Sequence, residues 1–342
     1  MTKILKYCIL TLFAICLSAC RKTDVDEGLV ALSFNAQAQD IEQELKSGAG
    51  AGIVKTEDAQ LKAKPFGVFG VWNDTEESTG GNNVFLQSTA QEVSYNGVDK
   101  WEYSPVQYWK LNKFYRFRAY HPYCGDSFTV NPSSSADNIM IEYNVVPGKD
   151  DLLVGFQAVE ATIDNIKKKV KFEFQHALCG LQFKIALKKV PEIAYGDYIT
   201  EFHIEGLIPT GTLRYTYDPS DVLLPIIDWI ATYYDSGSYF NWTGKKEFPK
   251  YKGDNAENIF DGTDQMVFCI PQTCSSAADK PTTIHFKTLG GGDADNSATL
   301  PTIKWEPGKI YVYTLLVNKS DLEIKVSIKD WKEIQSSEDV YL

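Results

Sequence analysis

The histidines and other residues of this 342-residue chain that could bind a metal or move a proton match the spacing of no known site. The four histidines are His121, His176, His203 and His285. They are far apart in the sequence, and none has a second ligand at the spacing of a metal site. His176 lies in a Phe-rich segment, which favours a hydrogen-bonded core or bulge residue. The sequence therefore predicts no metal and no cofactor.

Motifs for catalysis are missing as well. The chain has no GxSxG, no phosphate-binding glycine loop and no cysteine within a nucleophile signature. Residues 290–296 (GGGDADN) are acidic, but they lack the ligand spacing and the final Glu of an EF-hand, so we interpret them as a surface loop. Most tryptophans lie in or beside predicted strands, where core packing is the default. We therefore predict that the protein is not an enzyme.

The N-terminus has the pattern of a bacterial lipoprotein signal. Lys3 and Lys6 precede an apolar run over residues 7–17, and Leu-Ser-Ala then leads directly to Cys20. A basic start, a short apolar segment and small residues are typical of a secretory signal and too short for a membrane span. We predict that residues 1–19 are removed and that Cys20 is lipidated. The alternative is an ordinary signal peptide with a chance cysteine.

Four cysteines remain in the predicted mature chain, and none forms a CxxC pair. They are Cys124, Cys179, Cys269 and Cys274. Export permits disulfides, but spacing does not reveal connectivity. The sequence favours buried free thiols for most of them and leaves their pairing open.

Composition indicates an acidic β protein. The net charge is −11, which argues against a nucleic-acid partner because a phosphate-binding face needs clustered Lys and Arg. Tyr and Phe are abundant, and Gly and Pro interrupt the chain throughout. After the signal no apolar run is long enough to span a membrane. The closest, residues 222–234, contains Pro225 and Asp228, and we interpret it as a buried segment.

The first predicted strand carries Val30, Leu32 and Phe34 at a period of two, which predicts one buried face. A glycine-rich stretch over residues 48–52 follows, flanked by Lys46 and Lys55, and it has no side chains that could pack. Residues 66–72 are apolar on both faces and predict an interior strand.

We place a domain boundary near residue 168, which divides the mature chain into residues 20–168 and 169–342. After it, the apolar residues change from even to odd positions between residues 174 and 181, so residues 176–180 should contain a bulge or turn. The clearest strand comes last and is defined by Leu322, Ile324, Val326 and Ile328. A tail of residues 332–342 follows.

Several segments together resemble the fimbrillin family, the subunits of the type V pili of Bacteroidia. They are the lipobox at Cys20, FGVF at 66–69, WEYSP at 101–105, YW at 108–109, FRAYHP at 117–122, DLL at 151–153, FQHAL at 174–178, WEPGKIY at 305–311 and DW at 330–331. The likeness covers most of the mature chain in order.

This resemblance implies an all-β protein with two transthyretin-like β-sandwich domains in tandem. It also implies a structural subunit of a cell-surface fimbria with a role in adhesion, carried to the outer membrane as a lipoprotein. An extracellular trypsin-like protease would then remove the first strand, and a strand of a neighbouring subunit would fill the groove. Other pilus subunits, this protease and the outer membrane are the implied partners, with a host or bacterial surface ligand in addition.

The scheme requires a cleavage site and a donor segment, and this chain offers two candidates for each. The family's cleavage follows Arg, but no Arg lies between Arg21 and Arg116, so Lys46 is the first candidate and Lys55 the second. The donor segment is either the strand of residues 322–328 or the tail, whose aliphatic residues are Ile334, Val340 and Leu342. The strand equally suits an ordinary last strand of the second sandwich.

The alternative function is a monomeric, surface-anchored lipoprotein that binds glycan or host protein. Its candidate binding loops are residues 73–83 and 288–298, which are rich in Gly, Asn and Asp or Thr. Self-assembly after loss of the first strand distinguishes the two functions.

Overall fold

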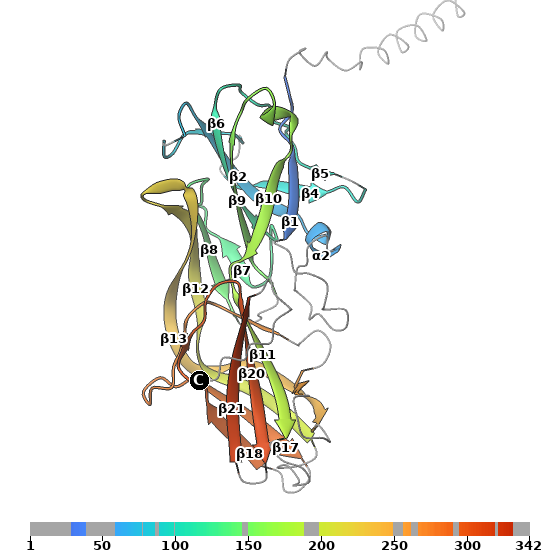
Figure 1. Ribbon diagram of the computed structural model, residues 1–342, viewed down its shortest axis with the longest axis vertical. Helices are drawn as coiled ribbons and strands as arrows, with labels where there is room; N and C mark the ends of the chain where they lie inside the picture. Colours follow the sequence, from blue (N-terminus) through green and yellow to red (C-terminus); the bar gives the residue numbers. More distant parts are fainter. Residues whose placement is uncertain are drawn as a thin grey trace, which may run out of the picture.

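The computed structural model describes residues 29–38, 59–76, 78–85, 89–98, 100–145, 150–187, 198–248, 256–260, 266–289, 294–318 and 321–330. Within them, strands dominate, accompanied by the short helix α2 (Ala59–Ala63) and the 3-10 turn η1 (Asn165–Lys167). The predicted all-β fold class is confirmed. The molecule is elongated, and its sheets follow one another along the long axis (Figure 1).

An eight-stranded sheet, here called the N-terminal sheet, forms one end of the molecule (Figure 1). Its strands, in spatial order, are β1 (Phe34–Ala38), β10 (Val170–His176), β9 (Leu153–Glu160), β6 (Phe114–His121), β2 (Phe66–Asn73), β4 (Gln91–Tyr95) and β5 (Trp101–Glu102), with β3 (Asn82–Asn83) beside β2. The C-terminal sheet at the other end contains β14 (Glu257–Asn258), β11 (Cys179–Leu187), β20 (Lys309–Asn318) and β21 (Asp321–Asp330), with β15 (Val267–Cys269) beside β11.

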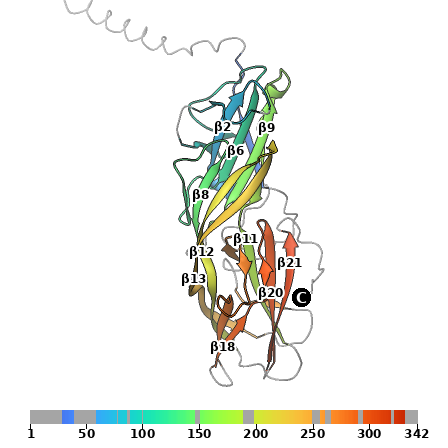
Figure 2. The ribbon, with the colours of Figure 1, turned by 90° about the vertical axis from the view of Figure 1, so that its left-hand side faces the viewer.

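A third sheet reaches into both ends, and we call it the shared sheet. It contains β18 (Ala294–Thr299), β17 (Thr283–Leu289), β12 (Tyr198–Asp218), β8 (Ile139–Asn144) and β7 (Phe128–Val130), with β13 (Asp221–Glu247) along β12. A small ladder pairs β16 (Thr273–Cys274) with β19 (Ile303–Lys304). Strand β12 pairs with β17 through residues 198–205 and with β8 through residues 210–215, so one strand links the two halves (Figure 2).

The apolar residues form two cores. One face of the N-terminal sheet carries the first core, which includes Leu32, Phe66, Phe117 and Phe172. The second core extends from Phe69 to Val326 and lies against the shared sheet in both halves. The predicted boundary near residue 168 is followed by β10, which pairs with β1 and β9 of the N-terminal sheet. The division into residues 20–168 and 169–342, and the transthyretin-like topology, stay predictions.

Strand β2 is an interior strand, as its apolar sequence predicts, and lies between β6 and β4. Its two glycines allow aromatic rings of β6 to lie directly against the backbone. A Cβ atom at Gly67 would stand 2.4 Å from the ring of Tyr120, and one at Gly70 would stand 2.7 Å from the ring of Phe117. A larger residue at either position would force a packed ring to move.

The break predicted at residues 176–180 is present and has a structural cause. Strand β10 ends at His176 in the N-terminal sheet, and β11 begins at Cys179 in the C-terminal sheet. Because the chain changes sheets, the apolar residues change phase. His176 is buried, with Nδ1 3.0 Å from Oδ2 of Asp151, in agreement with the prediction of a hydrogen-bonded core residue.

The segment of residues 222–234 differs from its predicted buried state. It belongs to β13, and the one strand in the described part of the chain that pairs with β13 is β12. Leu224 and Ile230 are 53% and 44% exposed. An edge strand with one covered face can therefore carry an apolar run that, in the sequence alone, resembles an interior segment.

The four remaining cysteines are free thiols in this structure. Cys124 is exposed, whereas Cys179, Cys269 and Cys274 are buried. Burial raises the pKa of Cys274 to about 11 and raises that of Cys179 well above its ordinary value, so both are protonated near neutral pH. No helix among the described residues is both long and apolar enough to cross a membrane.

His121, at the end of β6, predicts a pH dependence of stability. Burial, followed by the charge of Lys64, lowers the pKa of His121 to about 4 from 6.5. Between these values the unfolded chain binds more protons than the folded one, so stability falls as pH falls. We expect His121 to contribute a loss of about 2 kcal/mol between pH 7.5 and pH 5.

Urea denaturation of the protein and of its His121→Gln variant at the two pH values measures this loss. The variant should lose less of its unfolding free energy between pH 7.5 and pH 5, whatever its stability at neutral pH. Equal losses in both proteins would contradict the prediction.

Candidate functional site: the seat of the first strand

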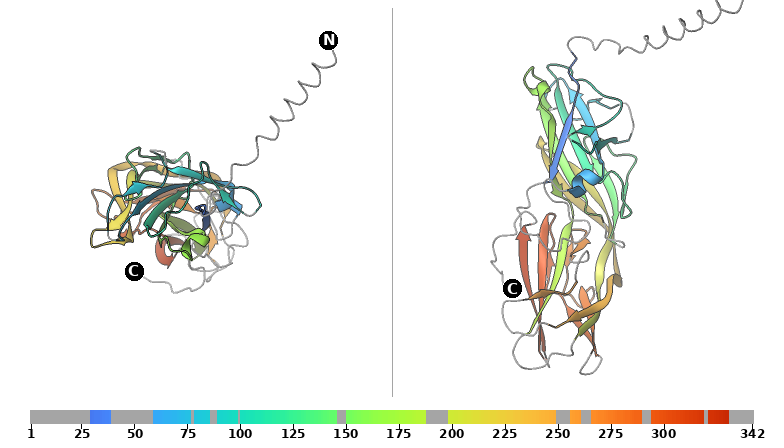
Figure 3. Two further views of the ribbon diagram at one scale, coloured as in Figure 1. Left: turned by 90° about the horizontal axis from the view of Figure 1, so that it is seen from above. Right: turned by 90° about the vertical axis from the view of Figure 1, so that its right-hand side faces the viewer.

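The first strand lies at the edge of the N-terminal sheet (Figure 3). Its side chains belong to the first core. Its exposure alternates along the chain. Leu32 and Phe34 are each 1% exposed and Ala36 is 8% exposed, whereas Ala31 and Asn35 face solvent. Val30 is half-buried and packs against the same core. The placement agrees with the predicted period of two.

Phe34 is the centre of this contact. Its ring stacks on Phe172 at a centroid distance of 5.8 Å and meets the edges of Phe66 and Phe117 at 6.2 and 5.8 Å. Tyr103 and Phe85 complete the surrounding set at 5.4 and 6.3 Å. Aromatic pairs in these geometries stabilise a fold beyond the area they bury. Removal of Phe34 would therefore open an apolar cavity walled by five rings.

The backbone of residues 30–38 is hydrogen-bonded first to one neighbouring segment and then to another. Residues 30–32 lie against residues 107–109, where the Leu32 amide donates to Gln107 O at 2.8 Å and the Trp109 amide donates to Val30 O at 3.1 Å. From Phe34 onward, β1 pairs in parallel with β10. The hydroxyl of Tyr103 also donates to Leu32 O at 2.9 Å. No strand of the described chain pairs with the other edge of β1.

The last strand, by contrast, is paired within its own sheet. All ten residues of β21 have partners on β20, from Asp330 opposite Lys309 to Asp321 opposite Asn318. Val326 is 6% exposed, Leu322 and Ile324 pack against the second core, and Ile328 is 38% exposed. In the isolated chain, this candidate donor strand is thus an edge strand of the C-terminal sheet.

Other predicted site residues lie outside the described residues. They are Cys20 and the signal of residues 1–19, the cleavage candidates Lys46 and Lys55, and Ile334, Val340 and Leu342 of the tail. Their roles stay predictions.

The sequence did not reveal that two arginines of β6, in the sheet that holds the first strand, are buried. Arg116 and Arg118 face away from the first core, yet they are only 1% and 0% exposed because the second core covers that face. Arg118 lies over the rings of Phe156, Tyr217 and Tyr215 at 4.9, 5.6 and 5.8 Å. Burial lowers its pKa to about 10. It therefore connects the N-terminal sheet to the shared sheet.

Arg116 holds the loop of residues 73–83. Its guanidinium donates to Ser78 O, to Gly80 O at 3.0 Å and to Oδ1 of Asp137 at 3.1 Å. The side-chain Nδ2 of Asn73 also donates to Ser78 O and Gly80 O, each at 3.0 Å. A loop tied at so many points is poorly suited to adapt to a ligand.

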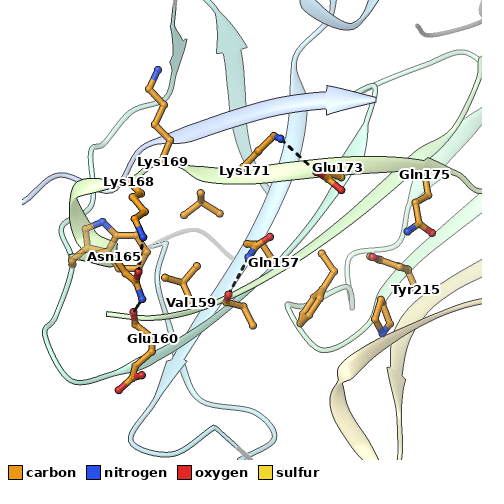
Figure 4. A pocket seen from close by; sticks show the side chains of 15 residues that line it. Gln157, Val159, Glu160, Asn165, Lys168, Lys169, Lys171, Glu173, Gln175 and Tyr215 are labelled. Atoms are coloured by element: carbon orange, nitrogen blue, oxygen red, sulfur yellow. Dashed lines mark hydrogen bonds and ion pairs between the residues drawn. The ribbon is translucent and has the colours of Figure 1, made fainter. Parts of the chain in front are cut away.

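An open depression of about 650 Å³ lies on the other face of β9 and β10 (Figure 4). Lys171, Glu173 and Gln175 line it, and Tyr215 and Pro225 of the β12–β13 hairpin form its far side. Because strand side chains alternate, Phe172 and Phe174 point to the opposite face and contact the first core. Lys171 pairs with Glu173 at 3.4 Å, and the lining is mostly polar.

Comparison with known proteins agrees with this architecture. A family model described as fimbrillin-like matches residues 54–331. The chain belongs to the fimbrillin-like family. No curated protein sequence matches the chain.

Solved structures of similar fold come from Bacteroides. A fimbrial protein of Bacteroides vulgatus is 14% identical, with a TM-score of 0.54 over 88% of this chain and 99% of that one. A protein of Bacteroides uniformis, provisionally named a cell adhesion protein, is 18% identical, with a TM-score of 0.51 over 90% of this fimbrillin-like chain and 100% of its own. A similarly named protein of Bacteroides ovatus is 12% identical, with a TM-score of 0.53 over 90% and 100%. At these identities the likeness concerns the fold.

The contacts of the first strand predict how much its side chains contribute to the free energy of unfolding. Leu32→Ala should lower the free energy of unfolding by about 2–5 kcal/mol and Phe34→Ala by about 3–5 kcal/mol, because each change leaves a cavity in the first core. Asn35→Ala, on the exposed face of the same strand, should change it by less than about 0.5 kcal/mol. Urea denaturation measures all three. If Phe34→Ala behaves like Asn35→Ala, the strand does not stabilise the fold.

Proposed function

We propose that this fimbrillin-like chain is a non-enzymatic structural subunit of a cell-surface fimbria with a role in adhesion. In this proposal it is exported as a lipoprotein through Cys20, reaches the outer membrane and is assembled by protease-triggered donor-strand exchange. The observation on which the proposal depends is the way the first strand packs against the first core. A strand at the sheet edge supplies Leu32 and Phe34 to the interior of the first core.

Physical reasoning supports an exchange at this position. Loss of residues 30–38 breaks the pairing of β1 with β10 and the hydrogen bonds of residues 30–32 with residues 107–109. The pairing of β10, β9, β6 and β2 is independent of this segment. The remaining sheet would expose an apolar groove floored by Phe172, Phe66 and Phe117. A strand from a second subunit with apolar residues at a period of two would restore the buried area, which favours assembly.

The family membership and the fimbrial and adhesion names of similar structures support the subunit role. His176 and Asp151 form a His–Asp pair, an arrangement that also occurs in catalytic sites. Its side chains are 5% and 0% exposed, so a substrate does not reach them, which supports a non-enzymatic role.

The alternative, a monomeric lipoprotein that binds glycan or host protein, has less support. One of its predicted loops, residues 73–83, is fixed by Arg116 and Asn73. In the other, residues 294–299 are strand β18, and residues 290–293 lie outside the described range.

Limited trypsin digestion of the chain of residues 21–342 tests the subunit role. We expect cleavage at Lys46 or Lys55, loss of the first strand and formation of oligomers. Mass spectrometry identifies the cleavage site, and size-exclusion chromatography detects the oligomers. The Lys46→Ala/Lys55→Ala variant should stay intact and monomeric. A chain that is cleaved there but stays monomeric would contradict donor-strand assembly.

A peptide in trans tests whether the groove is the assembly site. A synthetic peptide of residues 29–38, added during digestion, should occupy the groove and block oligomer formation. The same peptide with Phe34→Asp should not block it, because a buried carboxylate among aromatic rings is strongly disfavoured. Assembly that is insensitive to both peptides would place the joint elsewhere.

Truncation after Asp330 distinguishes the two donor candidates. Release of β21 would break its pairing with β20 and expose Val326, so we expect the tail to be the donor. The truncated chain should therefore be cleaved by trypsin and remain monomeric. Oligomers of normal size from the truncated chain would assign the donor role to Leu322, Ile324, Val326 and Ile328 instead.

A further inference from the structure

The shared sheet brings together two histidines and a carboxylate that are widely separated in the sequence. His203 of β12 and His285 of β17 are directly opposite each other in the antiparallel register. Glu205 follows His203 by two residues and therefore projects from the same face of the sheet. The three side chains are about one-third exposed, at 31%, 31% and 38%.

Their donor atoms converge. Nε2 of His203 lies 3.3 Å from Oε1 of Glu205, and Nε2 of His285 lies 3.1 Å from Oε2. The two imidazoles are stacked, with centroids 4.7 Å apart and planes inclined by 8°. The three ligand atoms lie within 4.8 Å of one another. Nε2 of His285 is buried and makes no hydrogen bond, despite the nearby carboxylate.

We propose that His203, Glu205 and His285 form a binding site for a divalent transition metal of the zinc type. Metal–nitrogen and metal–oxygen bonds of about 2.0–2.2 Å separate neighbouring ligand atoms by about 3.0–3.6 Å. The two distances to Glu205 already lie in this range. Two imidazoles and one carboxylate are a ligand set that favours zinc and its neighbours over Ca²⁺ and Mg²⁺, which take oxygen ligands.

The surroundings fix the backbone of the site, and binding of one ion requires the stacked imidazoles to rotate about their Cβ–Cγ bonds so that both Nε2 lone pairs point to it. The alternate residues Phe202, Ile204, Ile284 and Phe286 are buried in the second core, which fixes the backbone beneath the ligands. Lys287, which also lines the adjoining pocket, is paired with Glu201 at 2.8 Å. Its charge is therefore balanced by a carboxylate that is not one of the three ligands.

The coordination sphere has room for further ligands. A pocket of about 240 Å³ adjoins both imidazoles and is also lined by Asp295 and Asn296 of β18. Three protein ligands leave at least one position of a tetrahedral ion open, and the adjoining pocket offers space for a further ligand. Water or a donor group of another molecule would fill it.

Isothermal titration of purified, tag-free protein with Zn²⁺ tests the site. We expect one ion per chain, with affinity lowered at least tenfold in His203→Ala, His285→Ala and Glu205→Gln, because loss of even an outer partner of a metal ligand costs that much. Glu142→Gln, an exposed strand carboxylate on β8, is the matched control and should bind as the parent does. Circular dichroism of the metal-free variants checks their fold.

A spectroscopic readout locates the ion. Addition of Zn²⁺ should shift the imidazole signals of His203 and His285 in a nitrogen-detected NMR spectrum and leave those of the buried His121 and His176 unchanged. Absence of Zn²⁺ binding, equal binding by the parent and His203→Ala, equal loss in Glu142→Gln, or Ca²⁺ bound as tightly as Zn²⁺ would each overturn the proposal.

Discussion

The burial of Phe34 among five aromatic rings is the contact on which the N-terminal half depends. Phe34 belongs to a strand at the edge of its sheet, and this strand pairs with a single neighbour among the described strands, β10. The side chain of Phe34 is nevertheless only 1% exposed. Edge strands are normally short, charged or covered, because an open edge invites pairing with other chains. Here the edge strand completes the core, and its loss would expose both an apolar floor and the unpaired edge of β10. These are the two features that strand addition requires.

The opposite face of the same sheet is closed by other means. Arg118 is enclosed by the rings of Phe156, Tyr215 and Tyr217, and Arg116 binds the carbonyl groups of the 73–83 loop. A buried guanidinium loses its hydration, and stacked aromatic faces and carbonyl oxygens offset part of that cost. Arg118 joins two sheets, and Arg116 fixes a loop that would otherwise be free to move.

The long strand β12 has a similar joining role along the molecule. It is hydrogen-bonded to β17 in one half and to β8 in the other, and β13 accompanies it throughout. A continuous ladder resists bending better than a flexible linker between two separate bodies. An elongated subunit built in this way is suited to a fibre, in which load passes from end to end.

Local sequence pattern determined a good part of this structure. The alternation of Leu32 and Phe34, the two-faced apolar character of residues 66–72 and the phase change near His176 predicted a half-buried strand, an interior strand and a break, and all three are present. Side chains alternate by a rule that depends only on neighbouring residues, so such features can be predicted without the fold.

Tertiary structure decided which strands meet and what covers them. The parallel pairing of β1 with β10 and the burial of Arg116 and Arg118 depend on partners far away in the chain. His203 and His285 belong to separate segments, and only the register of β12 and β17 makes them neighbours. One sequence carries no record of such long-range pairing, because each pair is set by the packing of the whole sheet rather than by local residue type.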